Sequence, residues 1–374
     1  MRSILRRSLL VAAGLVLLTL APAIAAAAES TSYELADATH ARSPAIGADG
    51  TAWFVPERGT RWSGQSRSMI GSVAPDGTVS EREVAGFSVV TGVTVGPEGD
   101  PWVSGFRGRP YDHRFEISRL SPTGGLLRQY TVGRGRWSIR SVSVSDGAVW
   151  LIRESAQTTR SSETIERLSI GSGKVRRFAL PHGCRAYALD VAPDGTPWFT
   201  QKCGGFLGEG AASKASLSHI GPGGRIVRRP IAPKDYPVAL TIGPEGTVWF
   251  GAWAYYRPSR VGRLTSSGRL AEFAIPDGSP YSVAVGPEGR LWFGSSRGGH
   301  AGGLDSIGIG GKLGAPVCAD PSCDLEPIEV ARAPDGSLWF GLIRPNYNTG
   351  GGSSGLYIEE EIHNEAGFLG HLAF

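Results

Sequence analysis

Apolar and polar residues alternate along this chain in short runs that are separated by glycine turns. A tryptophan recurs in these runs at intervals of 43 to 51 residues, at Trp53, Trp102, Trp150, Trp198, Trp249, Trp292 and Trp339. Three residues before each tryptophan is a glycine that follows an acid, which gives Asp-Gly or Glu-Gly at all seven sites. Such pairs favour tight turns because glycine adopts positive φ without steric cost. Each repeat therefore predicts a hairpin whose second strand begins near the tryptophan.

A second hairpin follows in each repeat. Val261-Gly-Arg-Leu264 leads through a Ser-Ser-Gly turn into Leu270-Ala-Glu-Phe273, and residues 117–130 show the same pattern. Four short strands in a repeat of this length are typical of a β-propeller blade. Residues 29–374 are 346 positions, or about 49 for each of seven blades. The prediction is an all-β fold, a single seven-bladed propeller in which the tryptophans pack between blades.

The two ends of the chain predict how the ring closes. The seventh repeat supplies strands near Val330, at 338–342 and at 368–374, one strand fewer than the other repeats. At the other end, Ser32-Tyr-Glu-Leu35 resembles the fourth strands of the repeats. We therefore expect the N-terminal strand to complete the last blade and to cover an edge that would otherwise be exposed.

Residues 1–28 have the pattern of a secretory signal peptide. Arg2, Arg6 and Arg7 precede an apolar run at 9–20, and small residues follow from Ala23 to Ala28. Ordinary secretion and twin-arginine export both fit this segment. We expect residues 29–374 to be the mature protein, secreted or periplasmic, with no membrane span. It would carry 35 basic against 34 acidic residues, a balance that gives no electrostatic support for nucleic acid as a partner. A closed ring needs no partner for stability, so a monomer is expected.

Four cysteines fall into two pairs. Cys184 opens an inner strand and Cys203 ends its hairpin partner, so the turn between them places the two opposite each other. Cys318 and Cys323 bracket a short loop. In an exported protein both pairs are predicted to be disulfides, with free structural thiols as the alternative.

The repeat written G-P-E-G-x-x-W-F, followed by I/V-G-R-L and E-F-x-I-P, resembles the streptogramin B lyase family, the virginiamycin B lyase-like proteins. Residues 243–250, 261–264 and 271–276 carry this pattern most fully. The resemblance extends over all seven repeats and implies a seven-bladed propeller. It also implies metal-assisted elimination that opens the lactone ring of a cyclic depsipeptide, with Mg²⁺, histidines and glutamates at the channel mouth.

The residues that this reaction implies are missing from the corresponding positions. Pro-His-x-Ile segments open the inner strands of the family's last two blades, whereas this chain has Tyr281 and Ile328 in place of the histidines. The acid that follows Trp-Phe-Thr is replaced by Ser295 and Leu342. A general base needs a titratable group, and Mg²⁺ prefers oxygen ligands. Unless the long loops rebuild a site, we expect no lyase activity of the family type and no cofactor.

Long connections after the second strands of most repeats should crowd one face of the ring. They span 55–68, 104–116, 152–164, 200–216 and 341–366 and are rich in aromatic residues and arginine. This composition suits a peptide, glycan or protein partner. We expect four residues to contact the ligand at the channel mouth: Tyr281, Tyr187, Arg140 and Arg153. The preferred hypothesis is a non-catalytic binding protein. The alternative is a lyase-like enzyme that opens a cyclic ester with Mg²⁺.

Overall fold

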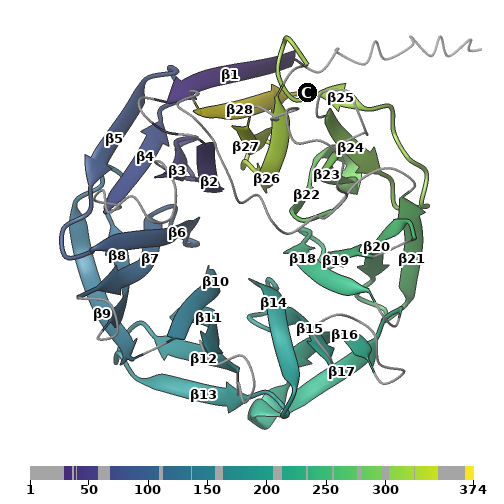
Figure 1. Cartoon of the computed structure of the whole chain (residues 1–374), viewed down its shortest axis with the longest axis horizontal. Coiled ribbons are helices and arrows are strands. Elements are labelled where there is room, and N and C mark those ends of the chain that lie inside the picture. Colours follow the sequence, from purple (N-terminus) through teal and green to yellow (C-terminus); the bar gives the residue numbers. More distant parts are fainter. Residues whose placement is uncertain are drawn as a thin grey trace, which may run out of the picture.

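The computed structural model describes residues 29–374 except 36–37, 39, 58–67, 109–112, 136, 156–162, 205–212, 233–234, 255–256, 276–279, 296–302, 324 and 344–366. The signal segment predicted at 1–28 and the tips of the long loops lie outside the described residues. Seven four-stranded antiparallel sheets stand around a central axis, which confirms the predicted propeller (Figure 1). Two short 3₁₀ turns, η1 (Pro222–Gly224) and η2 (Pro287–Gly289), are the helices among the described residues.

Within each blade, the strands are described in order from the central axis outward. The inner strands of blades 1 to 7 are β2 (His40–Ile46), β6 (Val89–Val95), β10 (Trp137–Ser145), β14 (Cys184–Val191), β18 (Tyr236–Ile242), β22 (Val283–Val285) and β26 (Glu326–Arg332). The second strands are β3 (Ala52–Glu57), β7 (Pro101–Arg107), β11 (Ala148–Ser155), β15 (Pro197–Cys203), β19 (Val248–Trp253), β23 (Leu291–Ser295) and β27 (Leu338–Ile343). The third strands are β4 (Met69–Val73), β8 (Arg114–Leu120), β12 (Thr164–Ser169), β16 (Lys214–Ile220), β20 (Ser259–Leu264), β24 (Gly303–Ile307) and β28 (Gly367–Ala373). The outer strands are β5 (Val79–Glu83), β9 (Leu126–Arg134), β13 (Val175–Ala179), β17 (Ile226–Pro230), β21 (Leu270–Ile275), β25 (Val317–Cys318) and, in blade 7, β1 (Glu29–Leu35).

The ring closes through its N-terminal strand. β1 pairs antiparallel with β28, with Tyr33 opposite Leu369, so the first strand of the chain is the outer strand of the last blade. The Tyr33 ring also stacks on Trp339 of β27 at 5.6 Å between centroids. Both contacts confirm the predicted closure, which leaves no unpaired outer edge on β28.

Side chains buried between neighbouring blades form the core. The repeating tryptophans are buried, except for Trp198, which is half-buried and stacks on His219 at 4.4 Å. The phenylalanines that follow them, such as Phe54 and Phe250, are fully buried. The prediction that these rings pack between blades is therefore confirmed, and they are not available as a ligand cage.

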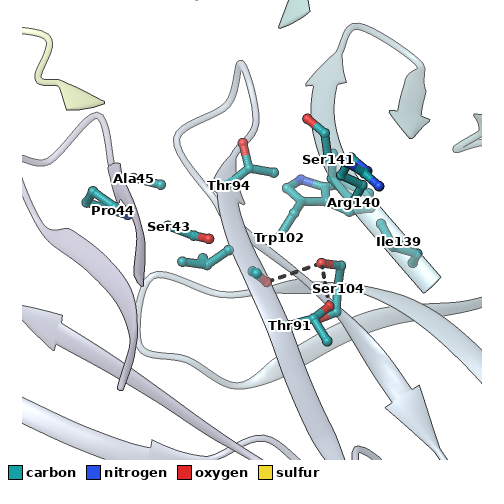
Figure 2. Close-up of a pocket in the computed structure, with 13 residues that line it drawn as sticks. Ser43, Pro44, Ala45, Thr91, Thr94, Trp102, Ser104, Ile139, Arg140 and Ser141 are labelled. Atoms are coloured by element: carbon teal, nitrogen blue, oxygen red, sulfur yellow. Dashed lines mark hydrogen bonds between the residues drawn. The ribbon is translucent and has the colours of Figure 1, made fainter. Parts of the chain in front are cut away.

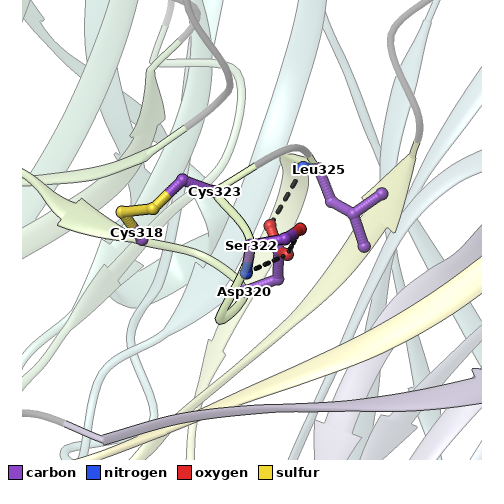
Figure 3. The surroundings of a disulfide bond; sticks show 5 residues. All are labelled: Cys318, Asp320, Ser322, Cys323 and Leu325. Atoms are coloured by element: carbon purple, nitrogen blue, oxygen red, sulfur yellow. Dashed lines mark hydrogen bonds between the residues drawn. A yellow bond between two sulfur atoms is a disulfide. The ribbon is translucent and has the colours of Figure 1, made fainter.

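Both predicted disulfides are present. Cys184 and Cys203 face each other across β14 and β15, as their antiparallel register requires. Cys318 and Cys323 close a small loop in which the Asp320 carboxylate accepts hydrogen bonds from the backbone of Ser322 and Leu325, each at 2.9 Å (Figure 3). The first bridge ties the end of β15 at the channel mouth, and the second fixes the short outer edge of blade 6.

Candidate functional site at the channel mouth

A cavity of about 600 Å³ lies on the axis and is lined by inner-strand residues of all seven blades. We call the end at which the inner strands begin and the second strands end the channel mouth; the cavity lining also reaches the opposite ends of these strands, at Ile46 and Arg332. Tyr281 is the aromatic residue that lines it, and Asp190 lines it from β14. Since all seven blades contribute, this channel is the place where side chains far apart in sequence come together.

Bulges in the inner strands determine which side chains turn toward the mouth. The pairing of β10 with β11 shifts register around Arg140, and the pairing of β14 with β15 shifts between Ala186 and Leu189, which places Tyr187 in the bulge. A bulged residue leaves the regular alternation of the strand and is aimed differently from its neighbours. Two of the four predicted ligand residues, Arg140 and Tyr187, therefore project from bulges.

These two residues contact each other. The Arg140 guanidinium carbon lies 5.4 Å from the centre of the Tyr187 ring and, on the other side, the guanidinium pairs with Glu154 of β11. Burial raises the pKa of Tyr187 to about 12, so its phenol stays neutral in the physiological range. Arg140 also lines a smaller pocket of about 240 Å³ in the channel wall of blades 1 to 3, beside Ser141 and Trp102 (Figure 2).

A row of aromatic rings continues from Tyr187 across blades 4 to 6. Tyr187 meets Tyr236 edge-on at 6.4 Å between centroids, Tyr236 lies 5.6 Å from Trp253, and Trp253 lies 6.4 Å from Tyr281. Tyr236 and Trp253 are buried, whereas Tyr187 is half-buried and Tyr281 is 41% exposed. We refer to these four residues as the aromatic row. It brings two predicted residues, Tyr187 and Tyr281, into one chain of contacts.

Arg153 lies elsewhere. Its guanidinium carbon is 4.3 Å from the centre of the Trp137 ring, and its Nη1 lies 3.3 Å from Oε1 of the buried Glu166 in β12. Arg177 binds the same carboxylate oxygen at 2.8 Å. These contacts make Arg153 part of the packing of blade 3, and no described contact joins it to the aromatic row.

The structure adds charged groups near Tyr236 of the aromatic row, of which Lys202, Asp235 and Arg260 were not singled out from the sequence. Lys202 of β15 is almost fully buried, with Nζ 3.2 Å from the centre of the Tyr236 ring. Burial lowers the pKa of Lys202 to about 8, an effect opposed by the nearby carboxylate of Asp235. Asp235 is fully buried, pairs with Arg257, and lies 3.6 Å from Nε of Arg260. Cationic groups thus contact the row at two places, Lys202 at Tyr236 and Arg140 at Tyr187.

A second group of charges lies at the seam of blades 7 and 1. Glu329 of β26 accepts a hydrogen bond from the backbone N–H of Ser43 and lies 3.9 Å from Nε of Arg42, which binds Glu57 at 3.2 Å. Burial raises the pKa of the Glu329 carboxyl. Burial also lowers the pKa of His40, opposite Glu57, to about 4, so this imidazole is neutral. Glu329 was not predicted as a site residue from the sequence, because it lies one residue after Ile328, which holds the family's histidine position.

The positions of the family's catalytic residues do not fit Mg²⁺. Leu342, at one acid position, is fully buried, and Ile328 offers no ligand atom. In the parts of the chain that the structure describes, no group of three or more His, Cys, Asp or Glu side chains could hold a metal. Mg²⁺ requires a nearly octahedral set of oxygens, supplied by carboxylates and water. Two described carboxylates near the mouth, Glu154 and Glu329, are instead paired with arginines.

Comparisons with known proteins agree with this architecture. Residues 207–350 match the model of the Virginiamycin B lyase family. This match and the seven-bladed ring fit a virginiamycin B lyase-like propeller. The match extends over the last part of blade 4, blades 5 and 6 and the first strands of blade 7, where the repeats come nearest to the family pattern. No curated protein matches the chain.

Solved structures share the fold at low sequence identity. Kuenenia stuttgartiensis hydrazine synthase aligns with a TM-score of 0.59 and 17% identity over 83% of this chain and 97% of that chain. The polysaccharide lyase Uly1 aligns with a TM-score of 0.55 and 11% identity over 91% of both chains. The β-propeller domain of the trilobed protease from Pyrococcus furiosus gives 0.54 and 10% identity, over 82% of this chain and 91% of that domain. At these identities the likeness concerns the fold alone.

Among the described residues, no helix is long and apolar enough to cross a membrane. The two disulfides are consistent with a secreted or periplasmic protein.

Proposed function

We propose that this chain is an exported binding protein that holds a peptide or glycan at the channel mouth, against Tyr187 and Tyr281 at the two ends of the aromatic row and the flanking cations. The observation that carries the proposal is the continuous line of rings from Tyr187 to Tyr281, with one exposed end. The disulfides and the signal-like N-terminal segment support export.

The chemistry of the row suits a ligand with flat apolar faces and polar edges. Tyrosine and tryptophan offer an apolar ring together with a hydrogen-bonding group, so they bind sugar rings and aromatic peptide side chains without ordering many torsions. The side chains of Arg140 and Arg257 are 25% and 38% exposed. A guanidinium binds carboxylate oxygens in a planar, bidentate geometry. The proposed ligand therefore carries an acidic or carbonyl group beside its ring.

Binding is favoured over ring-opening chemistry because other residue types occupy the positions of the family's catalytic histidines and acids. These residues are Tyr281, Ile328, Ser295 and Leu342. Tyr281 replaces a histidine and, with its phenol in the aromatic row, presents a surface for stacking. A general base must titrate near the working pH. The proposed role of Tyr281 is therefore contact with the ligand.

The test is a titration of the exported, purified protein followed by tryptophan fluorescence. The probes are chitohexaose, hexagalacturonate and a streptogramin B antibiotic. One stacked ring contributes about 0.5–1.5 kcal/mol, so Tyr281→Ala should weaken binding of at least one probe roughly 2- to 13-fold. Ile309→Ala is the matched control, because Ile309 is 53% exposed in the turn after β24 of blade 6. Equal affinities of the two variants, or no binding of any probe to the wild type, would refute the proposal.

A lyase that opens a cyclic ester is the second candidate, and one observation favours it. Glu329 holds a carboxyl of raised pKa at the mouth of blade 7, one residue from the family's histidine position. A carboxyl whose pKa is raised can act as a general acid or base. If the protein opens a streptogramin B ring and Glu329→Gln abolishes that reaction while the fold is retained, this candidate replaces the binding proposal.

A further inference from the structure

The outer surface of blades 3 and 4 carries an excess of positive charge. In blade 4, the described residues 213–232 include no carboxylate, while Lys214, Arg225, Arg228 and Arg229 are exposed. In blade 3, the two acids of the outer hairpin, Glu163 and Glu166, are fully buried and paired with arginines, among them Arg177. Lys174, Arg176 and Arg177 are exposed there. These seven basic residues are called the basic wall below.

The opposite side of the ring has the opposite charge. On the outer hairpin of blade 1 and on β1 of blade 7, the exposed charged residues in the described segments are Glu29, Glu34, Asp76 and Glu83. The near balance of 35 basic and 34 acidic residues in the mature chain thus conceals a polarised circumference. A net charge near zero does not exclude such a surface, because the field of local charges acts on a partner within about 10 Å at moderate salt.

The basic wall continues across the seams between blades. Nη2 of Arg176 on β13 donates to the Gly223 carbonyl in the turn of blade 4, at 3.1 Å. Arg128 of blade 2 donates in the same way to Gly171 of blade 3, at 3.4 Å. Figure 1 shows β9, β13 and β17 following one another along the rim. The arginines at these seams therefore join the strands into one surface rather than isolated patches.

We propose that the basic wall binds a linear anionic polysaccharide that runs along the outer rim, at a site separate from the channel mouth. Guanidinium groups in a row match sulfate or carboxylate groups in a row, and each contact is bidentate. Val227 on β17 and Leu127 on β9 are 40% and 56% exposed and offer apolar surface to the faces of sugar rings. Single-stranded nucleic acids require exposed aromatic side chains for stacking. The exposed aromatics in the described part of the chain are Tyr281 and Phe374, neither of which lies on this wall.

The test is the binding of fluorescent heparin dodecasaccharide, measured by anisotropy from 0.05 to 0.5 M NaCl. The variant is Arg225→Gln/Arg228→Gln, since no described contact ties either side chain to the core. With the counterion-release coefficient of duplex DNA, two lost contacts lower the slope of log K against log [NaCl] by about 1.8. If the wild type and the variant have equal affinities for heparin at 1 M NaCl, this difference in slope makes the variant bind roughly 30-fold more weakly than the wild type at 0.15 M NaCl.

The control Arg269→Gln/Lys312→Gln removes the same charge from the outer hairpins of blades 5 and 6, where both residues are exposed. The proposal predicts that this variant binds heparin like the wild type. Equal losses in both variants would show an effect of net charge alone and would overturn the proposal, as would a wild type that does not bind heparin. Tighter binding to duplex DNA or to anionic vesicles, or salt-sensitive self-association in light scattering, would also overturn it by identifying a different occupant. None of these results depends on a ligand at the mouth.

Discussion

Replacing Asp190 with alanine should loosen the inner wall of three blades at once. The Asp190 carboxylate accepts hydrogen bonds from Ser143 Oγ of blade 3 at 3.1 Å, from the Ile242 N–H of blade 5 at 3.0 Å and from the Val191 N–H at 2.8 Å. The variant leaves two backbone N–H groups and one hydroxyl without their acceptor.

The expected loss of stability follows from these contacts. A hydrogen bond to a charged group contributes about 1.5–3 kcal/mol, but water in the channel can replace part of it because Asp190 lines the cavity. Removing the carboxylate also removes the cost of burying its charge. The free energy of unfolding should therefore fall by about 2–4 kcal/mol. With an unfolding entropy of about 2.1 cal/mol/K per residue, the Tm should fall by roughly 3–6 °C.

The pH dependence has a definite sign. Burial raises the pKa of Asp190 to about 6 from its ordinary 3.8, although its hydrogen bonds oppose the shift. The folded protein thus holds this proton more tightly than the unfolded chain does. The stability that the group contributes is fully present below about pH 3.8 and is lost as the pH rises through about 6. The neutral variant Asp190→Asn removes this titration, so the wild type should lose stability relative to it between pH 4 and pH 7.

Urea unfolding at pH 4 to 7.5, followed by circular dichroism and tryptophan fluorescence, measures both effects. Asp146→Ala is the control, because Asp146 is exposed in the turn between β10 and β11. The reasoning is refuted if Asp190→Ala unfolds within 0.5 kcal/mol of the control, a margin typical of neutral surface changes. A difference between wild type and Asp190→Asn that does not vary with pH would refute the assignment of the titration.

Three further outcomes are expected. Arg153→Ala should destabilise the fold by about 1–3 kcal/mol without changing affinity at the mouth, because it deprives the buried Glu166 of a partner; intact stability in urea with lost binding would contradict this. Tyr281→Ala should shift the free energy of unfolding by less than about 1 kcal/mol, since the ring is 41% exposed; calorimetry showing a larger loss would make it a packing residue. Replacing both cysteines of the Cys184–Cys203 bridge by alanine should lower the free energy of unfolding by about 3 kcal/mol, because the two residues are 19 positions apart. The same change at Cys318–Cys323, with a separation of 5, should lower it by about 2 kcal/mol. The reverse order in thermal unfolding would contradict an entropic origin of the stabilisation.

The fold could be predicted from the sequence because its signals are local and repeated. The turn glycines and the tryptophans fix the hairpins, and a missing fourth strand in the last repeat leaves only the N-terminal strand to supply it. The disulfide between Cys184 and Cys203 was predictable for the same reason, since an antiparallel hairpin with a known turn places the two residues opposite each other.

The mouth could be predicted only in part, because bulges break the alternation on which a sequence prediction depends. Tyr187 and Arg140 project from such bulges, and the contact between them follows from two register shifts in different blades. Arg153 obeys the regular alternation and packs on Trp137 instead. The charged groups near Tyr236 were missed as well, because Lys202 precedes a cysteine in an ordinary second strand and shows no pattern of its own.

The central claim is that this propeller holds ligands at its mouth without the ring-opening reaction of the lyases that it resembles. The most direct test is incubation of purified residues 29–374, shown to be folded and disulfide-bonded, with a streptogramin B antibiotic and Mg²⁺. Chromatography separates cyclic from linear molecules, and mass spectrometry distinguishes elimination, which conserves mass, from hydrolysis, which adds water. The account predicts that the antibiotic remains cyclic. Metal-dependent conversion to a linear product of unchanged mass would contradict it.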